Sequence, residues 1–213
     1  MPGLVDVPEL GRRCEPAQQR ARDTVERILD AAAVLLDEVG IDGFNTNLLA
    51  EQAGVRVRTV YRYFPNKWAV VVALAERYAT WEREIVEAAL VSELERSDWR
   101  AALGRVIDRY VAAVEAAPGF LAVRRAARAA PELRAVDDRA ADGLAAELSV
   151  LLAAAGVALP ASRRTTIARA MIEAAISVLD LAYVAPVRRR RELIGELKRM
   201  QVAYLATYLE DGS

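Results

Sequence analysis

Apolar residues recur at intervals of three and four along most of the chain, and no strand-like alternation of useful length interrupts them. This spacing gathers apolar side chains on one side of a helix and predicts an all-α fold. In the first clear segment the apolar positions run from Val25 to Val39, and Gly40 follows where a glycine can end a helix. Ile41 and Phe44 then fall in a short connection, from which they can close the core.

Two short segments follow and are separated by Gly54. Thr46 is the predicted N-cap of a helix that runs to about residue 53. The second segment spans about residues 57–63 and ends before Pro65, because a residue that precedes proline disfavours the helical conformation. Two short helices joined by a glycine turn are the sequence form of a helix-turn-helix.

The remaining pattern predicts longer helices punctuated by proline and glycine. Asn66 is a candidate N-cap for a long helix, and further helices are expected at about 99–116, 120–129, 132–155, 162–184 and 188–210. The fold class is therefore all-α with about nine helices. The 213 residues suit one domain of moderate size or a small domain joined to a larger one.

Charge changes this picture only locally, because the formal net charge of the whole chain is −1. From Phe44 to Lys67 the chain carries four cations and one anion, Glu51. On the second short helix we expect the apolar residues to face inward and five polar ones to face outward, namely Arg56, Arg58, Thr59, Arg62 and Tyr63. A short basic helix fits the major groove of DNA, whereas the plainer alternative is a solvated helix face.

The stretch "NTNLLAEQAGVRVRTVYRYFPNK" resembles the DNA-binding signature of the TetR (tetracycline repressor) family of transcription regulators. The matching positions are Thr46, Leu49-Ala50, Ala53-Gly54-Val55, Thr59-Val60-Tyr61, Tyr63-Phe64 and Lys67. Two features depart from the family pattern. Arg56 and Arg58 stand where many members carry small residues, and Leu48 stands where a polar residue is common.

The resemblance implies roles for some of the matching residues, and Arg58 is added to them as a candidate although it departs from the family pattern. Thr46 and Lys67 resemble phosphate-binding residues, Tyr61 and Tyr63 resemble residues that contact the backbone or bases, and Arg58 and Thr59 are candidates for base edges. The alternative for Tyr61 is that one tyrosine of the pair mainly packs against the first helix. The DNA-binding candidates are thus Thr46, Arg56, Arg58, Thr59, Tyr61, Arg62, Tyr63 and Lys67. The implied domains are a flexible arm at 1–20, a helix-turn-helix domain at 21–68, and a ligand-binding and dimerisation domain at 69–213.

Two late helices support dimerisation independently of the resemblance. The segment 162–184 is apolar on two sides, and the last helix repeats apolar residues from Leu193 to Tyr208. A helix that is apolar nearly all round must be buried on both sides, which suits a four-helix interface between two subunits. The alternative is that both helices pack within one chain. A homodimer would match a palindromic operator in double-stranded DNA.

The signal for a small-molecule effector is weaker. Residues that could line a pocket are Trp81, Trp99, Tyr110, Phe120, Met171 and Asp180, and Arg124 and Glu173 join them if they are buried. Each of the apolar ones is also a plain core candidate, since apolar residues at helical spacing usually fill space.

Two rival readings are a helical metal-dependent enzyme and a helical interaction module that does not bind DNA. The first depends on Asp137, Asp138 and Asp142, which share one helix. The chain has no histidine, so the commonest general base is missing, and we expect no enzyme activity, metal or cofactor. The lone Cys14 and the lack of a run of about 18 apolar residues favour the cytoplasm. The favoured function is a cytoplasmic, homodimeric repressor released from its operator by a small, largely apolar molecule.

Overall fold

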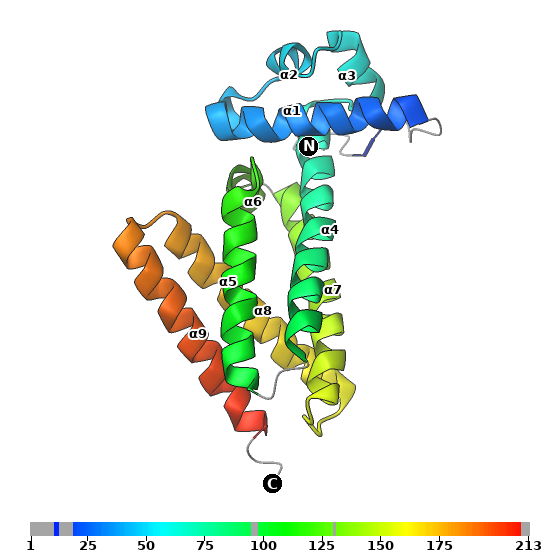
Figure 1. The fold of residues 1–213 in the computed structure, drawn as a ribbon. Coiled ribbons are helices and arrows are strands. Elements are labelled where there is room, and N and C mark those ends of the chain that lie inside the picture. Colours follow the sequence, from blue (N-terminus) through cyan, green and yellow to red (C-terminus); the bar gives the residue numbers. More distant parts are fainter. Residues whose placement is uncertain (1–10, 13–18, 95–97, 130, 210–213) are drawn as a thin grey trace, which may run out of the picture. The chain divides into compact units, whose positions relative to one another are not determined.

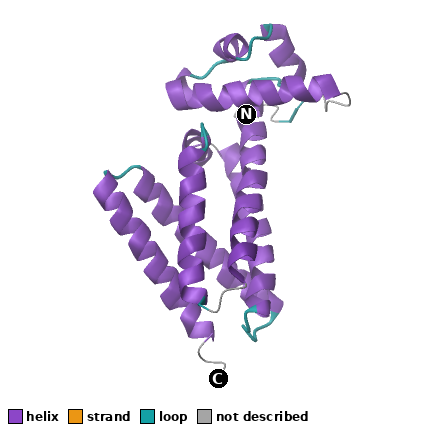
Figure 2. Cartoon of the chain, viewed as in Figure 1, coloured by secondary structure: helices purple, strands orange, loops and turns teal. Residues whose placement is uncertain are grey.

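The computed structural model describes residues 11–12, 19–94, 98–129 and 131–209, and these residues form helices and turns without a strand (Figures 1 and 2). The predicted all-α class is therefore confirmed. The helices are α1 (Gln19–Gly43), α2 (Thr46–Gln52), α3 (Val57–Tyr63), α4 (Lys67–Leu94), α5 (Trp99–Ala116), α6 (Phe120–Ala129), α7 (Pro131–Ala154), α8 (Ala161–Tyr183) and α9 (Val187–Leu209).

Glycine ends the first regular helix where the apolar pattern predicts. Gly40 has φ of 64° and ψ of −179°, which interrupts the helical conformation inside α1. A residue with a side chain rarely adopts this left-handed φ, so glycine is favoured here. The chain then turns and buries Phe44 in the core, as expected for a residue that closes the connection.

The described chain divides into two compact units that do not follow one cut in the sequence. The first unit combines residues up to Trp81 with Ala113–Asp137, and the second combines Glu82–Ala112 with residues from Asp138 onward. Helices α4, α5 and α7 contribute residues to both units. The division into functional domains at residue 68 stays a prediction.

In the first unit, α1 packs against α2 and α6, and α2 packs against α3. The α5–α6 turn approaches α1 closely at Gly119, whose backbone N–H donates to Oδ2 of Asp37 at 2.6 Å. Tyr78 donates a hydrogen bond to the carbonyl oxygen of Pro118 in the same turn, and its ring packs edge-on against Phe120 with 5.2 Å between the ring centres. These contacts fix the end of α1 and the start of α6.

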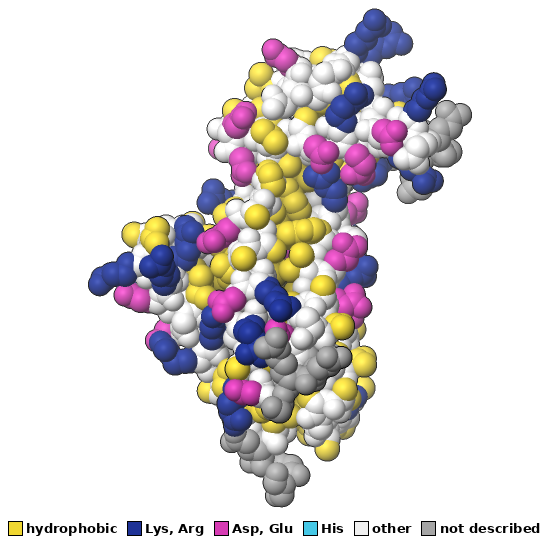
Figure 3. Space-filling view, viewed as in Figure 1, with side chains coloured by type: hydrophobic (Ala, Val, Ile, Leu, Met, Phe, Trp, Pro, Cys, Tyr) yellow, Lys and Arg dark blue, Asp and Glu magenta, His cyan; other side chains and the backbone are white. Residues whose placement is uncertain are grey.

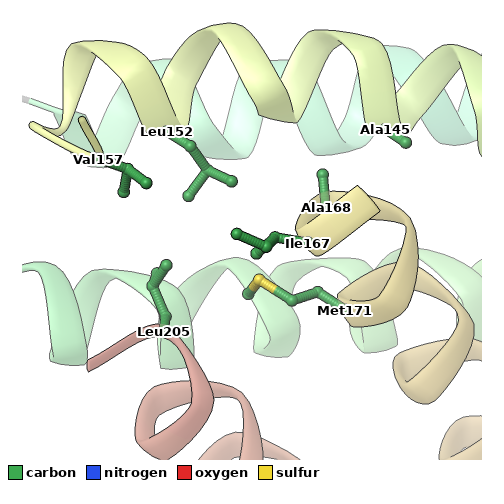
Figure 4. Packing of buried hydrophobic residues seen from close by; sticks show 7 residues of the cluster. All are labelled: Ala145, Leu152, Val157, Ile167, Ala168, Met171 and Leu205. Atoms are coloured by element: carbon green, nitrogen blue, oxygen red, sulfur yellow. The ribbon is translucent and has the colours of Figure 1, made fainter. Parts of the chain in front are cut away.

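In the second unit, α8 and α9 lie side by side, and an apolar cluster joins them to α7 (Figures 1 and 4). Figure 4 shows side chains from the three helices and the turn after α7 pointing toward one another. The cluster consists of Ala145, Leu152, Val157, Ile167, Ala168, Met171 and Leu205. Burial of this apolar surface supplies the main favourable free energy for packing the unit.

Candidate nucleic-acid interface and ligand pocket

Helix α2 is capped one residue earlier than its sequence predicts. Oδ1 of Asn45 accepts hydrogen bonds from the backbone N–H groups of Asn47 at 3.1 Å and Leu48 at 3.0 Å. Asn45 has an extended backbone, whereas Thr46 is the first helical residue, so the expectation that Thr46 is the N-cap is wrong. The Thr46 hydroxyl is instead buried and lies 2.9 Å from the hydroxyl of Tyr61.

The turn between α2 and α3 depends on Gly54, which has φ of 62°. Its N–H donates to the carbonyl of Glu51 at 3.1 Å, and the N–H of Val55 donates to the carbonyl of Ala50 at 2.9 Å. This pair of bonds is the glycine-dependent Schellman ending of a helix, and it satisfies carbonyls that α2 leaves without helical partners. The sharp reversal sets the direction in which α3 begins.

Helix α3 presents one buried side and one charged side. Val60 and Tyr63 are buried within α3, and Phe64 directly after it is also buried. Arg56, which directly precedes α3, and Arg58 and Arg62 within it are exposed. Figure 3 shows Lys and Arg side chains protruding around this helix. The buried residues therefore hold the helix so that its arginines face solvent.

The two tyrosines of α3 have opposite environments. Tyr63 is only 4% exposed, so the expectation that it faces outward is wrong, whereas Tyr61 is 42% exposed. A step of two positions along a helix turns by about 200°, so the two side chains point to nearly opposite sides, and burial of one places the other near the surface. Thr59, another candidate, is half-buried. Tyr61 is therefore the tyrosine of the pair that lies near the surface, with its hydroxyl beside that of Thr46.

Lys67 starts α4 beside the connection between α1 and α2. Its Nζ donates to the carbonyl oxygens of Ile41 at 3.3 Å and Phe44 at 3.5 Å. Asn66 caps the helix as predicted, since its Oδ1 accepts from the N–H of Ala69 at 3.0 Å. The Lys67 side chain is half-buried, so its charge stands near the surface while it holds two loop carbonyls.

The predicted N-terminal arm lies mostly outside the described residues, as does Cys14. Within the described part, the guanidinium of Arg12 lies 5.9 Å from the centre of the Phe64 ring, which directly follows α3. A contact of this length is compatible with a weak cation–π interaction.

The second unit contains a pocket with a cavity volume of about 150 Å³. Its lining comes from α4, α5, α7, α8 and α9, and among the candidates named from the sequence it includes Tyr110 and Met171. The Tyr110 hydroxyl donates to the carboxylate of Glu82. The lining residues are Glu82, Val86, Leu90, Leu103, Val106, Ile107, Tyr110, Leu144, Glu147, Leu148, Met171, Ile172, Ala175, Ile176, Leu179, Leu197 and Gln201.

The other six candidates do not line this pocket. Trp81 and Phe120 belong to the aromatic cluster of the first unit, and the guanidinium of Arg124 lies 5.6 Å from the Phe120 ring centre. Trp99 packs beside the apolar cluster of the second unit. Glu173 is exposed, which contradicts the burial that its candidacy required. The half-buried Asp180 is also absent from the lining.

Most pocket residues were missed because they are aliphatic side chains at ordinary helical spacing. Leu103, Val106 and Ile107 on α5 have the same pattern as residues that fill a core. Gln201 gives the one distinctive signal, as a polar residue in the apolar stripe of α9. It is buried, and its Nε2 donates to the carbonyl of Met171 at 2.8 Å.

An arginine pairs with the aspartates on which the metal-enzyme hypothesis depends. Arg169 pairs with Asp138 at 3.3 Å, with Asp142, and with Glu173 at 2.7 Å. Within the described residues no group of His, Cys, Asp and Glu has an arrangement that could hold a metal ion. None of the described helices is long and apolar enough to cross a membrane.

Comparison with known proteins matches both parts of this geometry. Residues 28–74 fit the family of bacterial regulatory proteins called tetR, and residues 98–205 fit the tetracyclin repressor-like C-terminal domain. The crystal structure of a TetR-family transcriptional regulator from Streptomyces coelicolor is 32% identical, with a TM-score of 0.67 over 87% of this chain and 99% of that one. The chain belongs to the TetR family. The resemblance in the α1–α4 segment and the expected helical body are both confirmed.

Two further similar proteins define how far the likeness extends. The class D tetracycline repressor of Escherichia coli is 46% identical over 55 residues, which are 26% of this chain and only 25% of that protein. The structure of FadR from Bacillus subtilis in complex with stearoyl-CoA has a TM-score of 0.63 and 19% identity, over 84% of this chain and 96% of that one. The first likeness is confined to about a quarter of the repressor's length, and the second shows a shared fold.

Proposed function

We propose that this TetR-family chain is a ligand-responsive repressor that binds a palindromic operator as a homodimer. The observation that carries the proposal is the two-sided character of α3. Its arginines are exposed while Val60 and Tyr63 are buried, so the fold holds a cationic surface of the width that enters a major groove.

The residues around α3 divide into two roles. Arg58 and Thr59 would contact base edges, and Arg56 and Arg62 would add guanine or phosphate contacts, because a guanidinium matches either in a bidentate way. Tyr61 and Lys67 would contact phosphates. The hydroxyl of Thr46 lies 2.9 Å from that of Tyr61, so we assign Thr46 the role of positioning Tyr61 rather than of a separate contact.

The exposed side of α8 and α9 supports the homodimer. Leu181 and Val184 on or directly after α8, and Met200 and Tyr204 on α9, are exposed. Ala170 and Ser177 on the same side of α8 are small, which allows a partner helix to approach closely. Large exposed apolar side chains beside small ones are typical of a surface that another protein covers. Two such helices from each subunit would form a four-helix interface.

The pocket of the second unit is the proposed effector site. It is lined mostly by apolar side chains with a few polar groups, which is the usual composition of a small-molecule site. The FadR relative with stearoyl-CoA supports a ligand role for this fold. Effector binding would favour a conformer in which the two α3 helices no longer match the spacing of successive major grooves.

A DNA-binding regulator of this kind needs no catalytic activity, so we propose that the chain is not an enzyme. We also propose that it acts in the cytoplasm, because it must reach chromosomal DNA. The metal-enzyme alternative has no remaining support, since Asp138 and Asp142 are paired with Arg169.

Selection of bound sequences from a random pool of duplex DNA at physiological salt tests the proposal. The expected result is a palindromic consensus with two half-sites. Light scattering of the purified chain should report a dimer, and Leu181→Glu with Val184→Glu should shift it to a monomer that selects no palindrome. A dimer that enriches no sequence would overturn the proposal and favour the interaction-module reading.

A further inference from the structure

The amide of Gln201 is a buried polar group in the wall of the pocket. Gln201 lines the pocket from α9 and is only 4% exposed. Its Nε2 donates to the carbonyl oxygen of Met171 on α8 at 2.8 Å. A backbone carbonyl can only accept a hydrogen bond, so this contact determines which end of the amide is the nitrogen and which is the oxygen.

The oxygen end of the same amide remains available. Among the described residues, no N–H or O–H group donates to Oε1 of Gln201. An amide oxygen has two lone pairs, and a buried acceptor without a donor destabilises the structure. A ligand in the pocket that donates a hydrogen bond to Oε1 would therefore satisfy a group that the described chain leaves without a donor.

The other polar groups of the lining have partners within the chain. The hydroxyl of Tyr110 donates to the carboxylate of Glu82, and Glu147 pairs with Arg83 at 3.8 Å. All other described lining residues are apolar, so no lysine or arginine lines the cavity. An ionised ligand group would lose its hydration in such surroundings, which is costly without a dedicated counter-charge. These surroundings favour a neutral ligand.

The size of the cavity limits the ligand further. Its volume of about 150 Å³ is that of an apolar cavity which holds one benzene molecule. Val106 and Ile107 of α5 and Met171 of α8 are buried in its wall and would pack against such a ring. A ring of this size leaves room for a single small polar substituent.

We propose that the effector is a compact neutral molecule, an apolar ring of about benzene size with one hydroxyl group that donates a hydrogen bond to Oε1 of Gln201. Gln201 is then the residue that determines specificity, and the apolar wall supplies most of the affinity. The inference rests on the proposed function in that it takes this pocket as the effector site. The alternative is that Gln201 only holds α9 against α8 through the carbonyl of Met171.

Four probes that share one benzene ring test the proposal. They are phenol, toluene, anisole and benzoate, each titrated calorimetrically into the purified chain in a sealed cell at neutral pH. A pocket without a partner for the hydroxyl would favour toluene, because phenol would lose its hydrogen bonds to water. We expect phenol to bind at least as tightly as toluene. Anisole cannot donate and should bind no better than toluene, and charged benzoate should bind most weakly.

A volume-conserving substitution isolates the amide. Gln201→Met should weaken phenol binding about tenfold relative to toluene, since the hydroxyl loses its acceptor. A purely structural role would instead weaken both probes equally. Gln19→Met is the matched control, because Gln19 is exposed, bonds Asp23 and does not line the pocket. It should leave all four affinities unchanged.

The outcomes separate this inference from the proposed function. Tighter binding of toluene than of phenol by the natural chain would overturn the inference, as would an unchanged ratio of the two affinities in Gln201→Met. If that variant bound no probe, the order of phenol, anisole and toluene in the natural chain would decide. Each negative result leaves the selection of a palindrome by the same chain untouched. Phenol-selective binding by a chain that selects no DNA sequence would support the pocket chemistry and overturn the repressor.

Discussion

The outer side of α3 and the pocket of the second unit are assembled in opposite ways. The exposed arginines of this side are Arg56, which precedes α3, and Arg58 and Arg62 within it, and the three lie within seven consecutive residues. The pocket draws its lining from five helices and from residues between Glu82 and Gln201. Local sequence therefore determines the chemistry of the first region, whereas only the fold determines which residues meet in the second.

The two regions also differ in how much their residue types reveal. Exposed arginine on a short helix is a distinctive chemical signal, while Leu, Ile and Val lining a pocket are the same residues that fill a core. Met171 illustrates the overlap, because it belongs both to the apolar cluster and to the pocket lining. A binding surface of charged groups is thus easier to recognise in a sequence than a binding cavity of apolar ones.

The largest expected effect tests whether the α1–α3 region is as self-contained as its local sequence suggests. Gly119 in the α5–α6 turn has φ of 72°, and a Cβ at this position would lie 2.7 Å from Cα of Ala33 in α1. Gly119→Ala combines backbone strain with an overlap against another backbone, so we expect it to lower the free energy of unfolding by about 3 kcal/mol. Urea unfolding measures this change.

Gly143→Ala is the matched control for Gly119→Ala. Gly143 lies inside α7, and a Cβ there would have no neighbour within 4 Å. Alanine has the higher helix propensity, so this variant should gain about 0.5–1 kcal/mol. If Gly119→Ala instead unfolded like the natural chain, the α5–α6 turn would not constrain α1, and the α1–α3 region would be more independent than the structure indicates.

Arg58→Ala should have the next largest effect, and it acts on DNA binding alone. Arg58 is exposed, so its loss removes no core contact, and we expect the free energy of unfolding to be unchanged. Loss of a bidentate base contact should weaken binding to the selected operator by about 2 kcal/mol, roughly thirtyfold, and relax selectivity at one base pair of each half-site. Operator titration by fluorescence anisotropy measures both quantities.

Arg58→Lys distinguishes a base contact from a phosphate contact. Lysine keeps the charge but loses the planar fork of donors, so a base contact should be lost almost as fully as in Arg58→Ala. Near-natural affinity and selectivity in Arg58→Lys would show that the position contacts phosphate only. In that case Arg56 or Arg62 would be the better candidate for base readout.

Much of the fold was predictable because its signals are local. The ranges of α5 and α6 match the structure to the residue. Pro118 and Gly119 separate the two helices and Pro131 follows α6, whereas the start of α5 is capped by Asp98. Asn66 caps α4 as expected. The first error was also local. Asn45 and Thr46 are neighbours in the chain, and both are residue types that commonly occupy the N-cap. Only the backbone conformation, which is extended at Asn45, shows which of them is the cap.

The remaining errors concern contacts between distant segments. The helical pattern could not tell which of Tyr61 and Tyr63 faces the core, because this depends on the angle at which α3 packs. The large side chains Trp81 and Phe120 meet in the first unit, with 5.5 Å between their ring centres, rather than in a ligand pocket. Their assignment required knowing that Ala113–Asp137 packs with the chain before Glu82.

Lys67 combines a property that the sequence shows, its positive charge, with contacts to distant residues that only the structure shows. If it neutralises one phosphate, Lys67→Ala should lower the slope of the logarithm of affinity against the logarithm of salt concentration by about one unit and weaken binding about tenfold. Lys67→Arg should retain the slope. A stability loss with an unchanged slope would instead assign Lys67 only to holding the carbonyls of Ile41 and Phe44.

The smallest effect concerns the hydroxyl of Tyr78, which bonds the α5–α6 turn through Pro118. Removing one such hydrogen bond in Tyr78→Phe should cost about 1 kcal/mol of unfolding free energy near pH 8. Burial raises the pKa of Tyr78, and the charge of neighbouring Arg77 only partly opposes this. The neutral phenol is therefore favoured in the folded state relative to the unfolded state.

The sign of this shift gives a pH test. Below the unfolded pKa of about 10 both states hold the proton, and the full stability of the natural chain is present. As pH rises above that value the unfolded state loses the proton first, so the natural chain loses stability that phenylalanine cannot lose. The difference between the natural chain and Tyr78→Phe in urea unfolding should accordingly shrink from pH 8 to pH 11. A constant difference would mean that the hydroxyl is well hydrated, and the α5–α6 turn would then be held mainly by Gly119 and Asp37.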